Sequence, residues 1–299
     1  MKKLVLWQSG EIEAEEKALG VLAGLYSQIV VVGAVYDLFT TGGHSLLLNG
    51  QALHRLEGED LKQQEFDFIL ATGKDVEFGK VLKATSELGI DADRVLLNRA
   101  VCIPGFTVEK YNQLRHSKLT IFSLACAGGI MTHTMGLPFL SPMVNMWMPW
   151  PHFLEFLSHP MEYVQLTPVF DRQEHNSMNG IDYPVYTING MELHMNHCRI
   201  ENKEDGLRDW EQRKKRINWF NVMILAGTAT QEYAQAFDAL PYAKKVCFTG
   251  RDFALDSAYY VGNDMDEYPS QAFANEYAWG KHPIYDMWDM MLYGKKTKI

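Results

Sequence analysis

The feature that most constrains the fold is an alternation of apolar runs with helical segments along the first hundred residues. The segment QIVVVGAVYD, residues 28–37, is an almost continuous run of Val and Ile, which is typical of a strand buried on both faces of a parallel sheet. Such an alternation predicts an open, mostly parallel sheet with right-handed crossovers. The predicted strands are residues 3–7, 28–37, 66–73 and 93–98, and the predicted helices are residues 11–26, 58–64 and 75–90.

The second half of the chain also reads as α/β. Apolar runs at residues 119–124, 221–226 and 245–249 predict three strands, with helical segments between them. A chain of 299 residues is long enough for two domains. We therefore predict an α/β protein with a Rossmann-like N-terminal domain, residues 1–115, and a second three-layer α/β domain, residues 116–299.

A Rossmann-like domain raises the question of a bound dinucleotide. The fingerprint for dinucleotide binding needs three glycines after the first strand, and only Gly10 is present there. Asp37, at the end of the second strand, is placed to accept ribose hydroxyls, but four glutamates between residues 11 and 16 would repel a pyrophosphate. Gly10 and Asp37 are the nucleotide-binding candidates of this domain, and the sequence names no cofactor.

Charge and cysteine content narrow the class of protein. The formal net charge is -9 at pH 7, so no diffuse basic field favours nucleic-acid binding, and we expect no such partner. The four cysteines are widely spaced without a CxxC pair, and the opening MKKLVLWQSGE does not have the pattern of a signal peptide. We interpret the chain as a cytoplasmic protein with reduced thiols.

One uncharged segment, residues 119–154, has two interpretations. It ends in a stretch dense in Met, Trp and Phe, but glycines and prolines interrupt it too often for a spanning helix, which needs about 20 consecutive apolar residues. The first interpretation is a buried strand followed by buried loops. The second is a Met/Trp surface, Met143–Phe153, that docks on a membrane face or on a protein partner.

The first candidate site is a strand-to-helix turn that runs from Ser123 through Cys126 to Gly128 and Gly129. Backbone N–H groups at a helix N-terminus suit a phosphate or a carboxylate, so we expect Ser123, Gly128 and Gly129 to cradle an anion. Cys126 is a candidate nucleophile. The alternative is that Cys126 is a small buried residue and that the glycines only allow tight packing.

The second candidate site is the basic run Arg-Lys-Lys-Arg. If residues 206–218 are mostly helical, Arg213 and Arg216 lie one turn apart on the face that carries Asp209, while the two lysines form a solvated, salt-bridged face. Two guanidinium groups suit a diphosphate or a carboxylate, with Trp210 beside them as a stacking surface. The alternative is that Asp209 neutralises Arg213 and that both arginines pack the two domains together.

The segment MELHMNHC places His194 and His197 three residues apart. The preceding YPVYTING predicts strand and turn, where such positions face opposite sides, so we predict no metal site. His197 is the candidate general base or phosphate donor, ahead of His194 in any role. Further along, Asp264-Met265-Asp266 matches the short DxD pattern with which many glycosyltransferases hold a divalent cation.

Together these segments resemble an uncharacterised bacterial family, domain of unknown function nineteen-nineteen, whose members are often labelled exopolysaccharide biosynthesis proteins. The resemblance covers roughly residues 119–250 and rests on FSLACAGGIMTHTMGLPFLSPMVNMWM, YPVYTINGMELHMNHC and WEQRKKRINWFNVMIL. The matching positions are Ser123, Cys126, Gly128, Gly129, Ser141, Pro142, Tyr183, Pro184, His197, Trp210, Arg213, Arg216, Ile217 and Asn218.

The resemblance implies a setting in cell-surface polysaccharide assembly, without an established chemistry. We expect a transferase acting on a nucleotide-activated sugar or another phosphorylated molecule such as a glycan. Its pocket would lie between the domains, with the Ser123–Gly129 loop and both arginines holding the anion and His197 transferring a proton. The alternative is a non-catalytic binding or assembly protein of the same pathway, in which Met143–Phe153 docks a partner and the arginines are structural.

Overall fold

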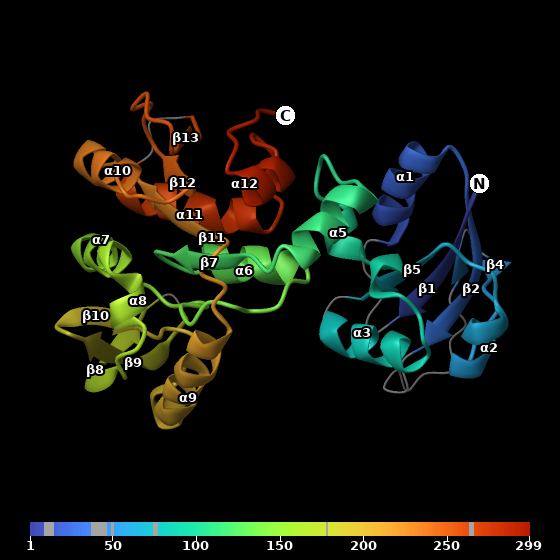
Figure 1. Cartoon of the computed structure of the whole chain (residues 1–299), viewed down its shortest axis with the longest axis horizontal. Coiled ribbons are helices and arrows are strands. Elements are labelled where there is room, and N and C mark those ends of the chain that lie inside the picture. The colour runs from blue at the N-terminus through green and yellow to red at the C-terminus, as the bar shows by residue number, and fades with distance from the viewer. Residues whose placement is uncertain (9–14, 37–46, 49–50, 74–76, 178, 263–265) are drawn as a thin grey trace. The chain divides into compact units, whose positions relative to one another are not determined.

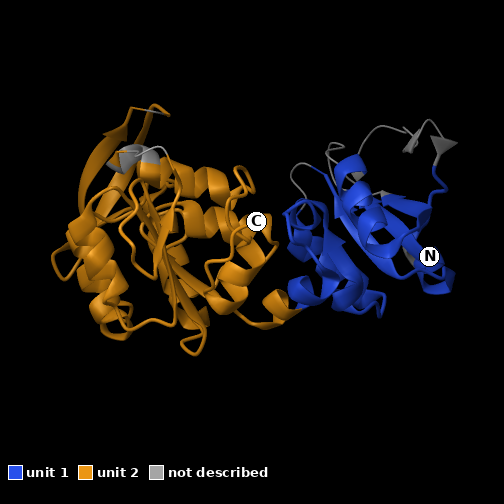
Figure 2. Ribbon diagram, turned by 90° about the horizontal axis from the view of Figure 1, so that it is seen from above, with its two compact units in different colours: residues 1–112 blue, residues 113–299 orange. Residues whose placement is uncertain are grey.

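The computed structural model describes residues 1–8, 15–36, 47–48, 51–73, 77–177, 179–262 and 266–299. The described chain forms two compact units, Met1–Asn112 and Gln113–Ile299 (Figure 2). Both contain helices and a parallel sheet, so the predicted α/β class is confirmed. Gly10, Asp37 and the first two residues of the DxD pattern lie outside the described residues.

Unit 1 contains a four-stranded parallel sheet in the order β2-β1-β5-β6 (Figure 1). In the central strand β1, the residues Leu4, Val5 and Leu6 are fully buried. β2 lies at the edge, and its Val30 is 38% exposed, so the prediction that residues 28–37 are buried on both faces is wrong. The strands are β1 Lys2–Gln8, β2 Ile29–Tyr36, β5 Phe68–Thr72 and β6 Val95–Leu97, with a short hairpin of β3 Leu47–Leu48 and β4 Gln51–Ala52.

Five helices accompany these strands among the described residues up to His116. Helix α3 begins after Glu77 and ends before Leu88, and it buries Phe78 and Val81. The positive φ of Gly89, 75°, turns the chain after the helix end, as the sequence pattern predicts. The helices are α1 Glu15–Tyr26, α2 Gly58–Gln63, α3 Phe78–Glu87, α4 Asn98–Val101 and α5 Val108–His116.

Unit 2 contains a second four-stranded parallel sheet, in the order β13-β12-β11-β7. Helices α6 and α11 pack against each other and against β11, whereas α10 packs against α7 and β12. The three strands predicted in this half are β7, β11 and β12. The elements are β7 Thr120–Ser123, α6 Ala127–Thr134, α7 Trp150–Ser158, β11 Val222–Thr228, α10 Gln231–Asp238, β12 Lys244–Thr249, β13 Ala258–Tyr260, α11 Glu267–Ala278 and α12 Met287–Tyr293.

A three-stranded antiparallel sheet, in the order β10-β9-β8, is inserted between β7 and β11 in the sequence. Its strands are β8 Val169–Asn176, β9 Ile181–Ile188 and β10 Met191–His194, and they lie between α8 Pro160–Tyr163 and α9 Lys203–Arg213 in the chain. Side chains alternate between the two faces of a strand. Tyr186, Ile188 and Leu193 lie on the face that joins the core.

One apolar core joins the two sheets of unit 2. Phe122 of β7 meets Phe156 of α7 edge to face, with 5.7 Å between ring centroids. The segment Met143–Phe153 belongs to this core: its methionines, Trp150 and Phe153 are buried. These side chains do not form an exposed Met/Trp surface, and their burial favours the first interpretation of this segment, although α6 and the start of α7 stand where it expects only loops. No helix in the described part of the chain has both the length and the apolar character needed to cross a membrane.

The core predicts that alanine substitutions at two phenylalanines change the free energy of unfolding by very different amounts. Phe156 is 0% exposed and Phe220 is fully exposed. We expect Phe156→Ala to lower the free energy of unfolding by about 3–5 kcal/mol, because it removes buried area and leaves a cavity. Phe220→Ala is the matched control and should change it by less than about 0.5 kcal/mol. Urea unfolding of both variants measures the difference, and equal losses would contradict the assigned core.

Candidate functional site

The strand-to-helix turn is arranged for tight packing. Helix α6 begins at Ala127, and the Gly128 N–H donates to the Ser123 hydroxyl oxygen over 3.1 Å. A Cβ on Gly128 would lie 2.7 Å from the Ser123 Cβ. The Gly128 N–H is therefore already paired inside the turn, and the predicted cradle is corrected at this donor; the role of Ser123 stays a prediction.

Asn145 connects this turn to His197. A side chain on Gly129 would collide with the Asn145 amide oxygen, so the glycine allows Asn145 to approach the helix start. Asn145 itself has a positive φ of 55°, a conformation that Asn tolerates better than most residues. Its backbone carbonyl oxygen lies 2.9 Å from Nδ1 of His197. The loop before α7 and the turn after β10 thus meet beside α6.

The contact with Asn145 fixes the tautomer of His197. A carbonyl oxygen only accepts hydrogen bonds, so Nδ1 carries the proton and Nε2 keeps its lone pair. His197 keeps an exposed surface, but the groups packed around its ring exclude part of its water, and this desolvation lowers its pKa. The Asn145 carbonyl opposes this by raising the pKa; the charge of Arg213 lowers it further, while Asp209 raises it. His197 is therefore a neutral imidazole at pH 7 with a free Nε2, the form that a general base requires.

Arg213 lies within electrostatic range of His197 and is itself largely buried, with 17% of its side chain exposed. Its Nη2 donates to Asp209 Oδ2 over 2.7 Å, as the helical spacing predicts. Its Cζ lies 5.9 Å from the centroid of the Phe139 ring. Its Nη1 is buried and has no hydrogen-bond partner among the described residues. One side of this guanidinium therefore has no hydrogen-bond acceptor from the described part of the protein.

Cys126 lies in the same cluster but is not set up as a nucleophile. Burial raises the pKa of its thiol, and a hydrogen bond with the Asn196 side chain lowers it by less. The thiolate is the reactive form, so a raised pKa keeps Cys126 protonated at neutral pH. All four cysteines are free thiols. The structure thus speaks against Cys126 as a nucleophile; the residue is only partly buried, so the alternative of a small packed residue holds in part.

Two predicted ligand contacts are corrected by the fold. Trp210 is fully buried in the apolar core, so its ring is not a stacking surface for a base or sugar. Asn218 lies at the amino end of β7, opposite the turn that follows this strand. Its Nδ2 donates to the carbonyl oxygens of Ser117 and Lys118 over 3.4 and 3.0 Å. Its amide group therefore holds the chain at that end of the sheet.

Ser141, Arg216 and Lys214 also differ from expectation. Ser141 is buried, and its hydroxyl accepts from the Met143 N–H over 3.2 Å within the loop, so it shapes the loop. Arg216 is exposed beyond the end of α9, in a 3-10 turn, where its charge acts on Arg213. Lys214 pairs with Glu211 over 2.7 Å, so the predicted salt bridge is confirmed, but its side chain is only 13% exposed and does not lie on a solvated face.

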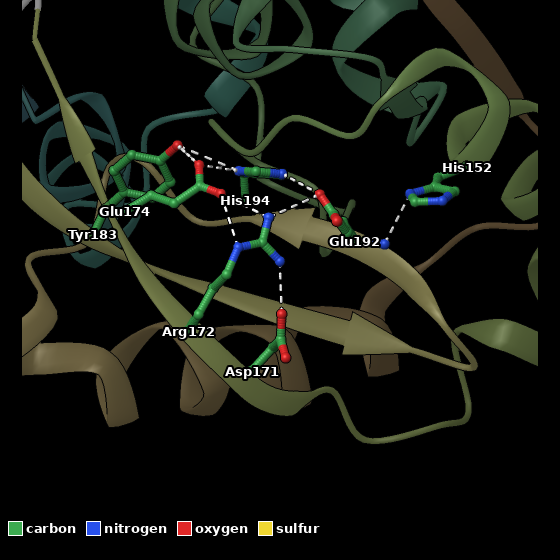
Figure 3. A network of polar contacts seen from close by, with 7 residues as sticks. All are labelled: His152, Asp171, Arg172, Glu174, Tyr183, Glu192 and His194. Atoms are coloured by element: carbon green, nitrogen blue, oxygen red, sulfur yellow. Dashed lines mark hydrogen bonds and ion pairs between the residues drawn. The ribbon is translucent and has the colours of Figure 1, made fainter.

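The antiparallel sheet carries a polar network that the sequence did not predict (Figure 3). Arg172 lies at its centre: Nη1 contacts Asp171 at 2.6 Å, and Nη2 contacts Glu174 at 2.6 Å and Glu192 at 3.1 Å. Together these carboxylates raise the pKa of Arg172. The signal in the sequence was the spacing of Arg172 and Glu174, two residues apart in a strand and hence on one face.

His194 is the buried member of this network, with a relative exposure of 2%. Its Nε2 lies 3.0 Å from Glu192 Oε2, and its Nδ1 lies 3.3 Å from the Tyr183 hydroxyl and 3.4 Å from Glu174 Oε2. Burial lowers the pKa of His194, and the two carboxylates oppose this in part. No three His, Cys, Asp or Glu side chains within the described ranges form a metal-binding group.

The tautomer assignment predicts how His197 titrates. We expect its pKa to lie below the ordinary value of about 6.5, because partial desolvation disfavours the charged ring. Its 15N shifts at pH 7 should be those of the Nδ1–H tautomer. An NMR titration measures both, and His197→Gln identifies the signals. A pKa at or above about 6.5 would contradict the partial desolvation of this ring by its neighbours.

The comparisons with known proteins give a family and no chemistry. Residues 98–293 match the family model described as Domain of unknown function (DUF1919). An uncharacterized protein of Haemophilus influenzae is 28% identical over 182 residues, which cover 59% of this chain and 84% of that protein. The matched region contains every residue of the cluster around His197 and Arg213. The chain therefore belongs to the DUF1919 family.

Proposed function

We propose that this chain is a transferase of cell-surface exopolysaccharide synthesis that acts on a nucleotide-activated sugar or a phosphorylated glycan. One observation carries the proposal: a neutral His197 with a free Nε2 lies within electrostatic range of Arg213, whose buried Nη1 has no protein partner in the described chain. A proton acceptor beside an anion-binding cation is the pair of groups that such a transfer requires.

In the proposed reaction, Arg213 binds a phosphate oxygen of the donor through Nη1, while Asp209 holds Nη2 and keeps the guanidinium in place. His197 Nε2 takes the proton from an acceptor hydroxyl, and that oxygen forms a bond to the sugar carbon. The bond from this carbon to the donor phosphate breaks, and the phosphate leaves with the electron pair. The charge of Arg213 stabilises the negative charge that develops on the leaving group.

The setting in surface-polysaccharide assembly comes from the label that members of the family often carry. It names a pathway and not a reaction, so the reaction class rests on the side chains of the site. The alternative function, a non-catalytic assembly protein, drew on an exposed Met143–Phe153 surface, and these apolar side chains are buried. We therefore place the transferase first, acting in the cytoplasm with its thiols reduced.

The same proposal includes nucleotide binding by unit 1, in the manner of a Rossmann-like domain. Its sheet has β1 between β2 and β5, so the order along the chain reverses at β1. In open α/β sheets, ligands bind beyond the carboxyl ends of the strands at such a reversal. Gly10 and Asp37 follow β1 and β2 in the sequence and remain the nucleotide-binding candidates there.

Arg213→Gln tests the anion site. Thermal shifts of the purified protein are measured with nucleotide sugars, nucleoside diphosphates and inorganic phosphate, with and without Mg²⁺ or Mn²⁺. A ligand at 100 times its dissociation constant adds about 2.7 kcal/mol to the stability of the folded state. We expect one class of phosphorylated ligand to give this shift and Arg213→Gln to weaken its binding at least about tenfold, because a charge-assisted hydrogen bond is lost.

Lys215→Gln is the matched control for this experiment. It removes the same charge from the exposed side of the same basic run, so it reports a general electrostatic effect. We expect it to change the affinity less than about twofold in physiological salt. Equal losses in the two variants would show that the ligand senses only net charge, and a wild-type protein that binds none of these ligands would overturn the proposed transferase.

His197→Gln tests the proton acceptor, with release of nucleoside diphosphate from the ligand found in the screen as the assay. We expect turnover to fall about 10²–10⁴-fold, the usual contribution of a general base, while binding is retained. In the wild-type protein, the rate should fall as the pH drops through the lowered pKa of His197, because protonation removes the lone pair of Nε2. A full rate in His197→Gln would remove His197 from the mechanism.

A further inference from the structure

The polar network on the antiparallel sheet lies close in the chain to the candidate site, since His194 precedes His197 by three residues. We propose that His194 and Trp147 act as a clamp that positions His197 for proton transfer. In this role the two residues touch neither substrate nor reacting atoms. The inference rests on the proposed function in taking His197 as the base, but its structural content concerns only the arrangement of His197 and Asn145.

The clamp consists of two backbone hydrogen bonds and one ring stack. The Trp147 N–H donates to the His194 carbonyl over 3.1 Å, and the His194 N–H donates to the Trp147 carbonyl over 2.9 Å. The two rings stack with 3.7 Å between centroids and 19° between planes. This paired bridge fixes the register between the loop that precedes α7 and the end of β10.

The same two segments meet a second time at the site. Asn145 lies two residues before Trp147, and His197 lies three residues after His194. The Asn145 carbonyl oxygen lies 2.9 Å from His197 Nδ1. The segments 145–147 and 194–197 are therefore joined at both ends, by this contact at one end and by the clamp at the other, and together they form a short closed loop of backbone. Because this loop is short, a shift of Trp147 relative to His194 moves the carbonyl that sets the tautomer of His197.

The network fixes the His194 ring from its edges. Nε2 is held by Glu192 and Nδ1 by Tyr183 and Glu174 (Figure 3). Arg172 in turn holds both carboxylates. Rotating this buried ring would leave several polar groups without partners, which is unfavourable away from water. Trp147 thus stacks on the His194 ring, which is held in place by contacts at both of its nitrogen atoms.

Neighbouring contacts hold the side of the turn that lies opposite the clamp. The Met195 N–H donates to the Pro184 carbonyl of β9 over 3.1 Å, and the Cys198 N–H donates to the Met195 carbonyl over 2.9 Å. The side of the turn that faces β9 is therefore held by the sheet itself. On the other side, the Asn145 carbonyl is held by the packing of Asn145 against Gly129 and, through the chain, by the clamp at Trp147.

The test compares variants of the full-length protein by 15N NMR of the histidine side chains, and it needs no ligand. Trp147→Leu removes the stack, and His194→Phe keeps a ring but removes its edge contacts. We expect both to reduce the population of the Nδ1–H tautomer of His197 and to move its pKa towards the ordinary value of about 6.5. Trp147→Phe retains an aromatic ring and should restore most of the wild-type signal.

His175→Phe is the matched control. His175 lies on β8 of the same sheet, is paired with Asp182 over 2.6 Å and is exposed, so its loss should leave the His197 signals unchanged. Circular dichroism and the amide spectrum verify that each variant is folded. If Trp147→Leu fails to fold, Trp147→Phe and Trp147→Tyr provide the graded series instead.

Two outcomes decide the matter. A folded Trp147 variant in which the tautomer and the pKa of His197 equal those of the wild type would overturn the clamp. A change in His175→Phe as large as in His194→Phe would overturn it as well, because the effect would then be general to the sheet. If no phosphorylated ligand binds the wild-type protein, the proposed transferase fails while this NMR result stands by itself.

Discussion

The structure of unit 2 depends on the burial of one apolar core shared by a parallel and an antiparallel sheet. Phe122 of β7, Phe156 of α7 and Tyr186 of β9 all contribute to it. Because the inner face of the antiparallel sheet is used in this core, its alternate side chains must lie on the other face. That constraint gathers Arg172 and its partners there. It also buries the segment before α7, which carries Asn145 and Trp147 to the positions that the site requires.

The two polar clusters of this unit differ in how completely the protein satisfies them. In the network, the Nε, Nη1 and Nη2 atoms of Arg172 each contact a carboxylate. In the cluster around His197, the Arg213 guanidinium is held by Asp209 on one side, and its buried Nη1 has no partner among the described residues. Folded proteins leave few buried donors without partners. This contrast gives Arg172 a structural role and leaves Arg213 as the residue on which the proposed anion site rests.

Much of the fold could be predicted from the sequence, because strands rich in Val and Ile and helices with regular apolar spacing carry local signals. The local pattern gave a wrong prediction where the burial of a strand depends on its position within the sheet. The Val/Ile run of β2 predicts a strand covered on both faces, yet this strand lies at the edge. β8, with the sequence VFDRQEHN, has few apolar residues. Its pairing with β9 stabilises it as a strand, and a local pattern does not reveal that partner.

The sequence by itself determined contacts set by the geometry of one helix, such as the pair of Asp209 and Arg213 four residues apart. It also determined which residue types were present for anion binding and proton transfer. Only the tertiary structure decided that Trp210 faces the core and that the Asn145 carbonyl meets His197, 52 residues away along the chain. Contacts between distant segments depend on which faces the core buries, and that follows from the packing of all the elements together.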